Sequence, residues 1–432
     1  MKAAAREERP RYGWYGDDFT GATDTLATWA ERGYRALLFL REPTAAQLAA
    51  ASPLDVIGLA GATRSMAPAA AEVQLEQAGR LFAALGVALL HYKCCSTFDS
   101  APDVGSIGAA VRTLKCHFPN TFIPIVGGQP NLGRYCLFGT LFAAAGTGGV
   151  VHRIDRHPTM SIHPVTPMRE ADLRRHLAAQ GLQRVDLIDY RAYETRQVDG
   201  LLDGCLRSRP DAVLFDVARE VDLPIIGRLI EDRLASGPML AVGPSSVAQA
   251  LAAASAIKTA EAVDDETPRG RDGAMLALVG SLSPVTRAQV DAASFYQHID
   301  LDPARLVADP GYGQQISQRA LAHLANGHVM LVTDAVREGR VRMDHLAVAT
   351  GKLLGAVLSA AQVARLIVAG GDTSSHAVAA LDIWGLSYRA ALIPGAPLCR
   401  VHSDTPRLDG LDIILKGGQM GPLDFFNEAA SC

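Results

Sequence analysis

Polar groups that could do chemistry gather near the N-terminus, in the segment WYGDDFTGATD of residues 14–24. Its adjacent carboxylates, Asp17 and Asp18, follow a short apolar run and precede a helical pattern. In open α/β sheets, ligands bind beyond the carboxyl ends of strands. A carboxylate there could accept the proton of a substrate hydroxyl. Asp18 or Thr20 could also cap the helix, so the sequence leaves open which of Asp17 and Asp18 is the base.

Two further segments place polar side chains just after apolar runs. Arg64 and Ser65 follow the predicted strand 55–60, and the planar guanidinium of an arginine suits a carboxylate. Lys93 ends the predicted strand 89–93. Three hydroxyl and carboxylate side chains come directly afterwards, at Ser96, Thr97 and Asp99. A second cluster at a strand's carboxyl end favours a binding site over isolated surface charges.

Cysteines and histidines in the N-terminal half suggest metal chemistry only at first sight. Cys94 and Cys95 are adjacent, and no Cys or His partner lies at zinc-finger spacing, so we expect structural roles for them. Residues 152–168 hold three histidines, but Pro158 and Pro164 favour an extended loop over the helical pairing of a zinc protease. We expect an ordered loop over a site and no protein-held metal.

Three glycine-rich turns follow predicted strands in the C-terminal part, at residues 280–286, 370–374 and 416–421. Glycines let the backbone approach phosphate closely, and helix N-termini present free N–H groups to anions. One such turn could be an ordinary connection, whereas three favour a phosphate-bearing ligand. None matches the P-loop pattern or the dinucleotide-binding G-x-G-x-x-G.

Composition excludes several classes of protein. The chain has 432 residues, 49% of them apolar, and a net charge of −4, which gives no field to hold nucleic acid. No window approaches the 18 or so apolar residues of a membrane span. The N-terminal segment carries charge where a signal peptide needs an apolar stretch. The seven cysteines are odd in number and include no C-x-x-C pair, so we expect reduced thiols and a cytoplasmic protein.

Short apolar runs alternate with helical patterns along the chain, which predicts largely parallel sheets flanked by helices. The polar segment 258–273 interrupts this alternation and is predicted to be a linker. We therefore expect two α/β domains, at residues 10–257 and 274–432. The other predicted strands are 35–40, 122–126, 185–188, 212–217 and 239–242 before the linker, and 275–280, 329–333, 365–369, 389–393 and 412–415 after it.

Six motifs, in this order along the chain, resemble those of the four-carbon acid sugar kinases: residues 16–22, Lys93 with 96–99, 163–168, 280–283, 370–374 and 416–421. The resemblance covers nearly the whole chain. It implies an ATP-dependent kinase that phosphorylates the terminal hydroxyl of threonate, erythronate or 3-oxo-tetronate. The N-terminal domain would hold the acid sugar and the C-terminal domain ATP, with the active site in the interdomain cleft.

The resemblance also implies roles for individual residues. The catalytic residues would be Asp17, Asp18 and Lys93. Those holding the acid would be Thr20, Arg64, Ser65, Ser96, Thr97, Asp99 and His163. Those holding ATP would be Ser281, Ser283, Gly370, Gly371, Asp372, Thr373, Gly417, Gly418 and Gly421. Mg²⁺ would bridge the ATP phosphates and keep several waters.

Substrate identity is less sharply indicated than reaction type. The run from Lys93 to Asp99 is similar to the 3-oxo-tetronate branch of the family, whereas residues 153–160 look more like a branch acting on the five-carbon relative 3-oxo-isoapionate. Two other classes compete, a non-catalytic sugar-acid sensor and a dehydrogenase. Another ATP-using enzyme on a sugar acid is a further alternative. The absence of a basic face counts against the sensor. A homodimer is the expected default for a soluble enzyme.

Overall fold

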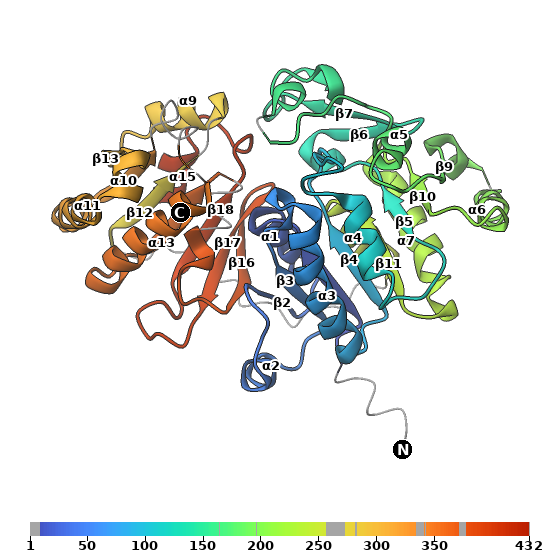
Figure 1. Ribbon diagram of the computed structural model, residues 1–432, viewed down its shortest axis with the longest axis horizontal. Coiled ribbons are helices and arrows are strands. Elements are labelled where there is room, and N and C mark those ends of the chain that lie inside the picture. Colours follow the sequence, from blue (N-terminus) through green and yellow to red (C-terminus); the bar gives the residue numbers. More distant parts are fainter. Residues whose placement is uncertain are drawn as a thin grey trace. The chain divides into compact units, whose positions relative to one another are not determined.

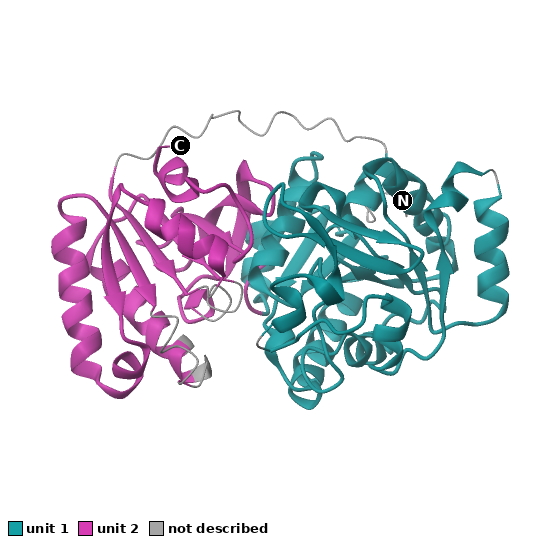
Figure 2. Cartoon of the chain, turned by 90° about the horizontal axis from the view of Figure 1, so that it is seen from above, with its two compact units in different colours: residues 1–38, 42–263 teal, residues 39–41, 264–432 magenta. Residues whose placement is uncertain are grey.

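The computed structural model describes residues 9–163, 165–195, 197–255, 273–280, 283–333, 341, 343–370 and 377–431 (Figure 1). The chain divides into two compact units, coloured separately in Figure 2. The first comprises Met1–Leu38 and Glu42–Val263, and the second Phe39–Arg41 and Asp264–Cys432. Among the described residues, no helix combines the length and apolarity that a bilayer crossing requires. The limits 10–257 and 274–432 stay predictions, and residues 258–272 of the expected linker lie outside the described part.

The first unit is built on a sheet whose strands are mostly buried along their whole length. Burial on both faces explains why most of them could be recognised as short apolar runs. From β3 to β9 the neighbouring strands are parallel. The strand order is β2 (Ala36–Phe39), β3 (Val56–Ala60), β1 (Tyr12–Gly16), β4 (Leu89–Lys93), β11 (Met239–Gly243), β5 (Pro124–Val126), β10 (Ala212–Phe215) and β9 (Val185–Ile188).

Helices cover both faces of this sheet. On one face, α3 (Pro68–Leu85) packs against α4 (Ile107–Leu114). On the other, α8 (Ser246–Ala254) packs against α1 (Phe19–Ala30) and α7 (Leu223–Glu231). Right-handed crossovers between parallel strands place the two groups on opposite faces. The remaining helices of the unit are α2 (Ala45–Ala51), α5 (Leu173–Ala178) and α6 (Val198–Arg207).

A small antiparallel sheet in the first unit was not expected from the sequence. It consists of β6 (Arg134–Leu137), β7 (Thr140–Ala144) and β8 (Val151–Arg153). After β8 the chain forms two short 3₁₀ turns, Ile154–Arg156 and Met160–Ile162. The expected extended loop over 152–168 is therefore wrong in part, because its described residues include a strand end and two helical turns.

Within the described part of the second unit, five neighbouring strands of the sheet are parallel, and an antiparallel pair of strands follows them. Their order is β13 (Tyr296–Leu301), β14 (His328–Thr333), β12 (Met275–Val279), β15 (Arg365–Ala369), β18 (Asp412–Lys416), β17 (Ala396–His402) and β16 (Gly385–Ile393). The last two run antiparallel to each other, and β17 also to β18. The helices α10 (Pro303–Ala308), α11 (Pro310–Leu324) and α13 (Met343–Ala360) pack together, and α9 (Pro284–Ala292) packs with α15 (Phe425–Ser431).

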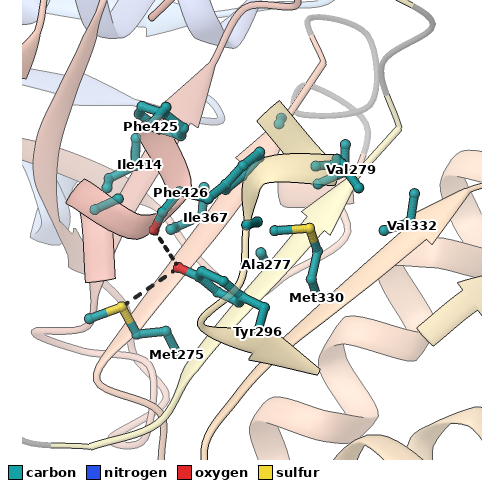
Figure 3. Close-up of a cluster of buried hydrophobic side chains, with 14 of the residues drawn as sticks. Met275, Ala277, Val279, Tyr296, Met330, Val332, Ile367, Ile414, Phe425 and Phe426 are labelled. Atoms are coloured by element: carbon teal, nitrogen blue, oxygen red, sulfur yellow. Dashed lines mark hydrogen bonds between the residues drawn. The ribbon is translucent and has the colours of Figure 1, made fainter. Parts of the chain in front are cut away.

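The core of the second unit between its sheet and the α9–α15 pair is a cluster of buried apolar side chains (Figure 3). Its one phenol, Tyr296, donates a 3.1 Å hydrogen bond to the carbonyl oxygen of Phe426. This bond satisfies the hydroxyl inside an apolar environment. The two α/β units, each a largely parallel sheet flanked by helices, confirm the predicted fold class.

Candidate active site

The carboxyl ends of four strands lie at one level in the first unit. Gly16, the last residue of β1, is paired with Ala60 of β3 and with Lys93 of β4. Lys93 is also paired with Gly243 of β11. The polar segments that follow these strands therefore meet at one edge of the sheet, where ligands bind in this class of fold.

Asp18 is the N-cap of α1. Its Oδ1 accepts a 2.9 Å hydrogen bond from the backbone N–H of Gly21. Its other oxygen, Oδ2, lies 3.0 Å from Nη1 of Arg64. Both carboxylate oxygens of Asp18 therefore have partners. The sequence allowed Asp18 or Thr20 as the cap of this helix, and the structure shows Asp18 in that role. This geometry gives Asp18 a positioning role.

Asp17 differs from its neighbour. It is 3% exposed, and its Oδ1 has no hydrogen-bond partner. Burial, followed by the nearby charge of Asp18, raises the pKa of Asp17 to about 7, against opposing effects of Arg64 and Lys93. A buried carboxylate with a free oxygen and a pKa near neutrality has the properties of a general base.

Lys93 lies against the first turn of α1. Its Nζ donates a 2.7 Å hydrogen bond to the carbonyl oxygen of Cys94. A Cβ atom at Gly21 would come within 2.4 Å of that Nζ, so the close approach requires glycine. Burial opposes the charge of the ammonium, but the carboxylates of Asp18 and Asp17 raise the pKa of Lys93 overall. Lys93 is therefore a buried, charged cation beside Asp17.

The turn after β4 brings a second buried carboxylate to the site. Thr97 Oγ1 donates a 2.5 Å hydrogen bond to Oδ1 of Asp99. Burial opposes ionisation of Asp99, but Arg64 and His163 outweigh it and lower its pKa. Burial, then the charge of Asp99, raises the pKa of the Cys95 thiol to about 12. Burial therefore favours the protonated thiol of Cys95.

A buried hydrogen-bond network holds this turn in place. Phe98 has a φ of 54°, a left-handed conformation that is strained for a side chain of its size. Ser100 Oγ donates to the carbonyl oxygen of Phe98 at 2.9 Å. The ring of His176 and the amide of Gln180, both from α5 or just beyond it, contact Ser100 Oγ at 2.9 and 2.8 Å. The small helix thus supports the conformation that presents Asp99.

The other expected acid-binding residues lie in the same region with less specific contacts. Thr20 is buried and its hydroxyl has no hydrogen-bond partner. Ser65 donates to the carbonyl oxygen of Ala62 at 3.2 Å within its own 3₁₀ turn. Ser96 is half-buried in the turn after β4. His163 Nδ1 accepts a 3.1 Å hydrogen bond from the backbone N–H of Thr166.

Two buried side chains that the sequence analysis did not select also lie near this edge. Gln129 follows β5, is fully buried, and donates a 3.0 Å hydrogen bond from Nε2 to Asp24 Oδ2 on α1. Its Oε1 has no partner. Arg134 begins β6 and is paired with Gln129 by backbone hydrogen bonds. The polar residue just after a predicted strand was the sequence signal that could have identified Gln129.

Arg134 is a buried cation that makes no ion pair with a described residue. It is 7% exposed, donates from Nη1 to the carbonyl oxygen of Leu132, and leaves Nε without a partner. Burial lowers its pKa, while the charges of Cys95, Asp99 and Asp24 oppose that change. An unpaired buried guanidinium is costly unless a ligand completes its hydrogen bonds.

The three glycine turns of the second unit also begin at one level. Val279 of β12 is paired with Ala369 of β15, and Ala369 with Lys416 of β18. The N–H of Gly280 donates to Ala369 at 3.0 Å, and that of Gly370 to Lys416 at 2.8 Å. These side-by-side turns fit the close approach of a phosphate chain to backbone.

The last of these turns is tied to the helix that follows the first. Thr286 on α9 donates a 2.7 Å hydrogen bond to the carbonyl oxygen of Gly418. Lys416 is fully buried and donates from Nζ to Thr286 Oγ1 at 3.1 Å and to Gly417 at 3.0 Å. Burial lowers the pKa of Lys416 to about 7. Gln289 Nε2 contacts the carbonyl oxygens of Met420, Gly421 and Pro422.

Of the residues expected to hold ATP, Ser281, Gly371, Asp372 and Thr373 lie outside the described part of the chain. Ser283 is the N-cap of α9 and accepts from the N–H of Val285 at 3.2 Å. Gly370 and Gly421 have φ values of 121° and 87°, which suit glycine. Within the described ranges, no group of three or more His, Cys, Asp or Glu side chains is arranged to hold a metal ion.

Comparison with known proteins assigns a role to each unit. Residues 12–251 match the model of a sugar-binding N-terminal domain, and residues 276–426 that of a nucleotide-binding C-terminal domain. The chain is 38% identical to a 3-oxo-isoapionate kinase of Paraburkholderia graminis, covering 96% of this chain and 92% of that protein. It is 32% identical to a 3-oxo-tetronate kinase of Methylobacterium radiotolerans, covering 96% and 98%.

Solved structures show the same fold. A protein of Salmonella typhimurium LT2 superposes with a TM-score of 0.76 at 25% identity, covering 97% of this chain and 98% of that one. Protein HI1011 of Haemophilus influenzae superposes with a TM-score of 0.68 at 23% identity, covering 96% and 98%.

A sugar-binding unit and a nucleotide-binding unit in one chain define a carbohydrate kinase, a phosphotransferase with an alcohol group as acceptor. The chain belongs to the four-carbon acid sugar kinase family, whose members include the 3-oxo-isoapionate and 3-oxo-tetronate kinases. Membership of a kinase family implies that it uses ATP. The predicted family and reaction class are therefore confirmed, in preference to the sensor and the dehydrogenase.

Proposed function

We propose that this kinase phosphorylates a terminal hydroxyl of 3-oxo-isoapionate, with Asp17 as the general base. The observation that carries the assignment of the base is the unpartnered Oδ1 of Asp17, whose pKa burial raises to about 7. The choice of acid is supported by the higher identity to the 3-oxo-isoapionate kinase, 38%, than to the 3-oxo-tetronate kinase, 32%.

In the proposed reaction, the hydroxyl proton passes to Asp17 as the hydroxyl oxygen forms a bond to the γ-phosphorus. The bond from that phosphorus to the bridging oxygen of the diphosphate breaks, and ADP leaves. Asp18 keeps α1 and Arg64 in place through its two contacts. Lys93 supplies positive charge near the transferring group, because phosphoryl transfer is promoted mainly by positioning and electrostatic stabilisation.

The acid would be held on the side of the site formed by the helix α1 and the turns after β4 and β5. Thr20 and Asp24 lie on one face of α1, one turn or about 6 Å apart along its axis. Thr97, Asp99 and the unpartnered Oε1 of Gln129 add polar groups for sugar hydroxyls. Arg134, a buried guanidinium without a carboxylate partner, would bind the substrate carboxylate.

In the second unit, the turns that begin at Gly280, Gly370 and Gly417 would hold the ATP phosphates. Their paired register and the buried Lys416 support this assignment. Mg²⁺ would be held mostly by the ATP phosphates and water, and it would neutralise phosphate charge.

A coupled ADP-release assay with Mg-ATP tests the proposal against 3-oxo-isoapionate, 3-oxo-tetronate, threonate and erythronate. We expect the highest kcat/KM with 3-oxo-isoapionate. Preferential turnover of another acid would contradict the choice of substrate and leave the kinase intact. No ADP release with any acid, from a protein that still binds ATP, would contradict the acid class.

A further inference from the structure

A buried carboxylate, Asp216, lies at the carboxyl end of β10 and takes no part in the proposed reaction. It is fully buried and directly follows Phe215, the last residue of the strand. We propose that Asp216 is a positioning residue, which holds the hairpin of β6 and β7 so that Arg134 meets the substrate carboxylate. The inference rests on the proposed function, because it takes Arg134 as the residue that binds the acid.

The carboxylate of Asp216 binds the turn between the two strands of this hairpin. Its Oδ2 accepts a 2.5 Å hydrogen bond from the backbone N–H of Phe138, and its Oδ1 accepts a 2.9 Å hydrogen bond from that of Gly139. The carbonyl oxygen of the next residue, Val217, accepts a third bond, of 2.9 Å, from the N–H of Cys136 on β6. The hairpin is thus tied to the end of β10 at three points.

The turn needs this support because its backbone is strained. Leu137 and Thr140 are paired, so Phe138 and Gly139 form a two-residue loop with φ values of 52° and 77°. Two positive φ angles are typical of a type I′ turn, which favours asparagine before the glycine. A bulky residue such as phenylalanine is unusual at positive φ. The carboxylate of Asp216 compensates with two charge-assisted hydrogen bonds.

Arg134 lies at the other end of the same strand. It begins β6, and its backbone exchanges hydrogen bonds of 2.9 and 3.1 Å with Gln129. These bonds fix one end of the hairpin. Asp216 fixes the other end, which is roughly 10 Å away at the rise of a β-strand. If the contact with Asp216 is lost, the hairpin can tilt about Gln129, and the guanidinium of Arg134 moves with it.

Asp216→Asn weakens this contact with little change in size. An asparagine has one acceptor oxygen, so its amide nitrogen would face one of the two N–H donors of the turn. Asp222→Asn is the matched control. Asp222 is also buried, and its Oδ2 accepts hydrogen bonds from the backbone N–H groups of Ala218 and Arg219 at 3.1 and 2.9 Å. Both of these partners lie in the connection after β10, outside the hairpin.

The test measures the KM of each full-length variant for 3-oxo-isoapionate, for the primary amide of this acid and for ATP. We expect Asp216→Asn to raise the KM for the acid about 5- to 20-fold, because a small misplacement of a binding group is costly. The KM values for the amide and for ATP should not change. Asp222→Asn should leave all three KM values unchanged.

A double variant separates positioning from general stability. In the Arg134→Met background, Asp216→Asn should not raise the KM for the acid any further, since the effects of residues that act through one another are not additive. Circular dichroism melting curves identify any variant that fails to fold. If Asp216→Asn is such a variant, it is combined with Phe138→Asn, which favours the type I′ turn itself while the tie to β10 stays broken. The same rise in the KM for the acid is then expected.

Three results would overturn the inference. The first is an unchanged KM for the acid in a folded variant that lacks the Asp216 carboxylate. The second is an equal rise in the KM values for acid, amide and ATP, and the third is an additive effect in the Arg134→Met background. Failure of the proposed function looks different, because Arg134→Met would then leave the discrimination between acid and amide undiminished while Asp216 is intact.

Discussion

Arg64 Nη1 lies 3.0 Å from Oδ2 of Asp18, the residue that caps the first turn of α1. Because the cap and this ion pair use both oxygens of Asp18, the adjacent carboxylate of Asp17 is the one left with an unpartnered oxygen. Two neighbouring acids therefore have different roles, and the choice that the sequence left open is resolved in our proposal in favour of Asp17.

Asp17→Asn should lower kcat about 10²–10⁴-fold, the usual contribution of a general base. The KM for the acid should change little, since the amide keeps the size and polarity of the side chain. Steady-state kinetics with the acid varied and ATP saturating measure both quantities. Asp18→Asn is the comparison, and asparagine remains a good N-cap. A smaller loss of kcat in Asp17→Asn than in Asp18→Asn would reverse the two roles.

The rate should also report the ionisation of Asp17. A base must be deprotonated to act, so kcat/KM of the wild type should fall as pH drops below about 7, the pKa of Asp17. Arg64 lowers that pKa through its positive charge. Arg64→Gln should therefore move the acidic limb of the pH profile to higher pH. If the acidic limb stays in place or moves to lower pH, it does not reflect the ionisation of Asp17.

Stability should change in the opposite sense from activity in Asp17→Asn. The pKa of Asp17 rises from 3.8 to about 7 on folding, so the unfolded chain ionises first as pH increases. The wild type consequently loses stability between those two pH values, and the full penalty is present above the higher one. The variant lacks this penalty. Its melting temperature should exceed that of the wild type by more at pH 8 than at pH 5, and a lower value at pH 8 would contradict the assigned burial cost.

Most of the fold could be predicted because buried parallel strands have a simple sequence pattern. The strands β4, β11 and β15 are buried at every position and stand out as short apolar runs. In contrast, β13 has exposed polar residues at three of its six positions, so it does not form an apolar run. The hairpin strand β17 and the small sheet from β6 to β8 depend on tertiary packing, which composition does not encode.

The candidate site, like the fold, could be predicted only in part from the sequence. Asp17 comes directly after the buried strand β1, Lys93 ends the buried strand β4, and Asp99 lies in the turn after β4, where polar residues are conspicuous. Arg134 begins a strand of the small sheet, and only the three-dimensional fold brings it near the charge of Asp99. Burial of an arginine cannot be read from neighbouring residues, because it depends on which segments cover it.

The contact between α9 and the last glycine turn predicts an effect confined to the nucleotide. Thr286→Val keeps the shape of the side chain but removes the 2.7 Å hydrogen bond to Gly418 and a partner of Lys416. We expect the KM for ATP to rise about 5- to 20-fold, on the order of one lost hydrogen bond to a buried group. The KM for the acid should stay constant, and an equal rise in both would indicate general loss of structure.

Arg134 gives the sharpest test of how the acid is oriented. If its guanidinium binds the substrate carboxylate, Arg134→Met should raise the KM for the acid about 10- to 100-fold, the value of a charge-assisted hydrogen bond, and leave the KM for ATP unchanged.

The primary amide of the same acid provides the control, because it has the shape of the substrate without the charge. The wild type should discriminate strongly against the amide, whereas Arg134→Met should accept the two about equally. Arg134→Lys should recover only part of the discrimination, since a lysine cannot form the paired hydrogen bonds of a guanidinium. Undiminished discrimination in Arg134→Met would place the carboxylate against a different cation, with Lys93 the next to substitute.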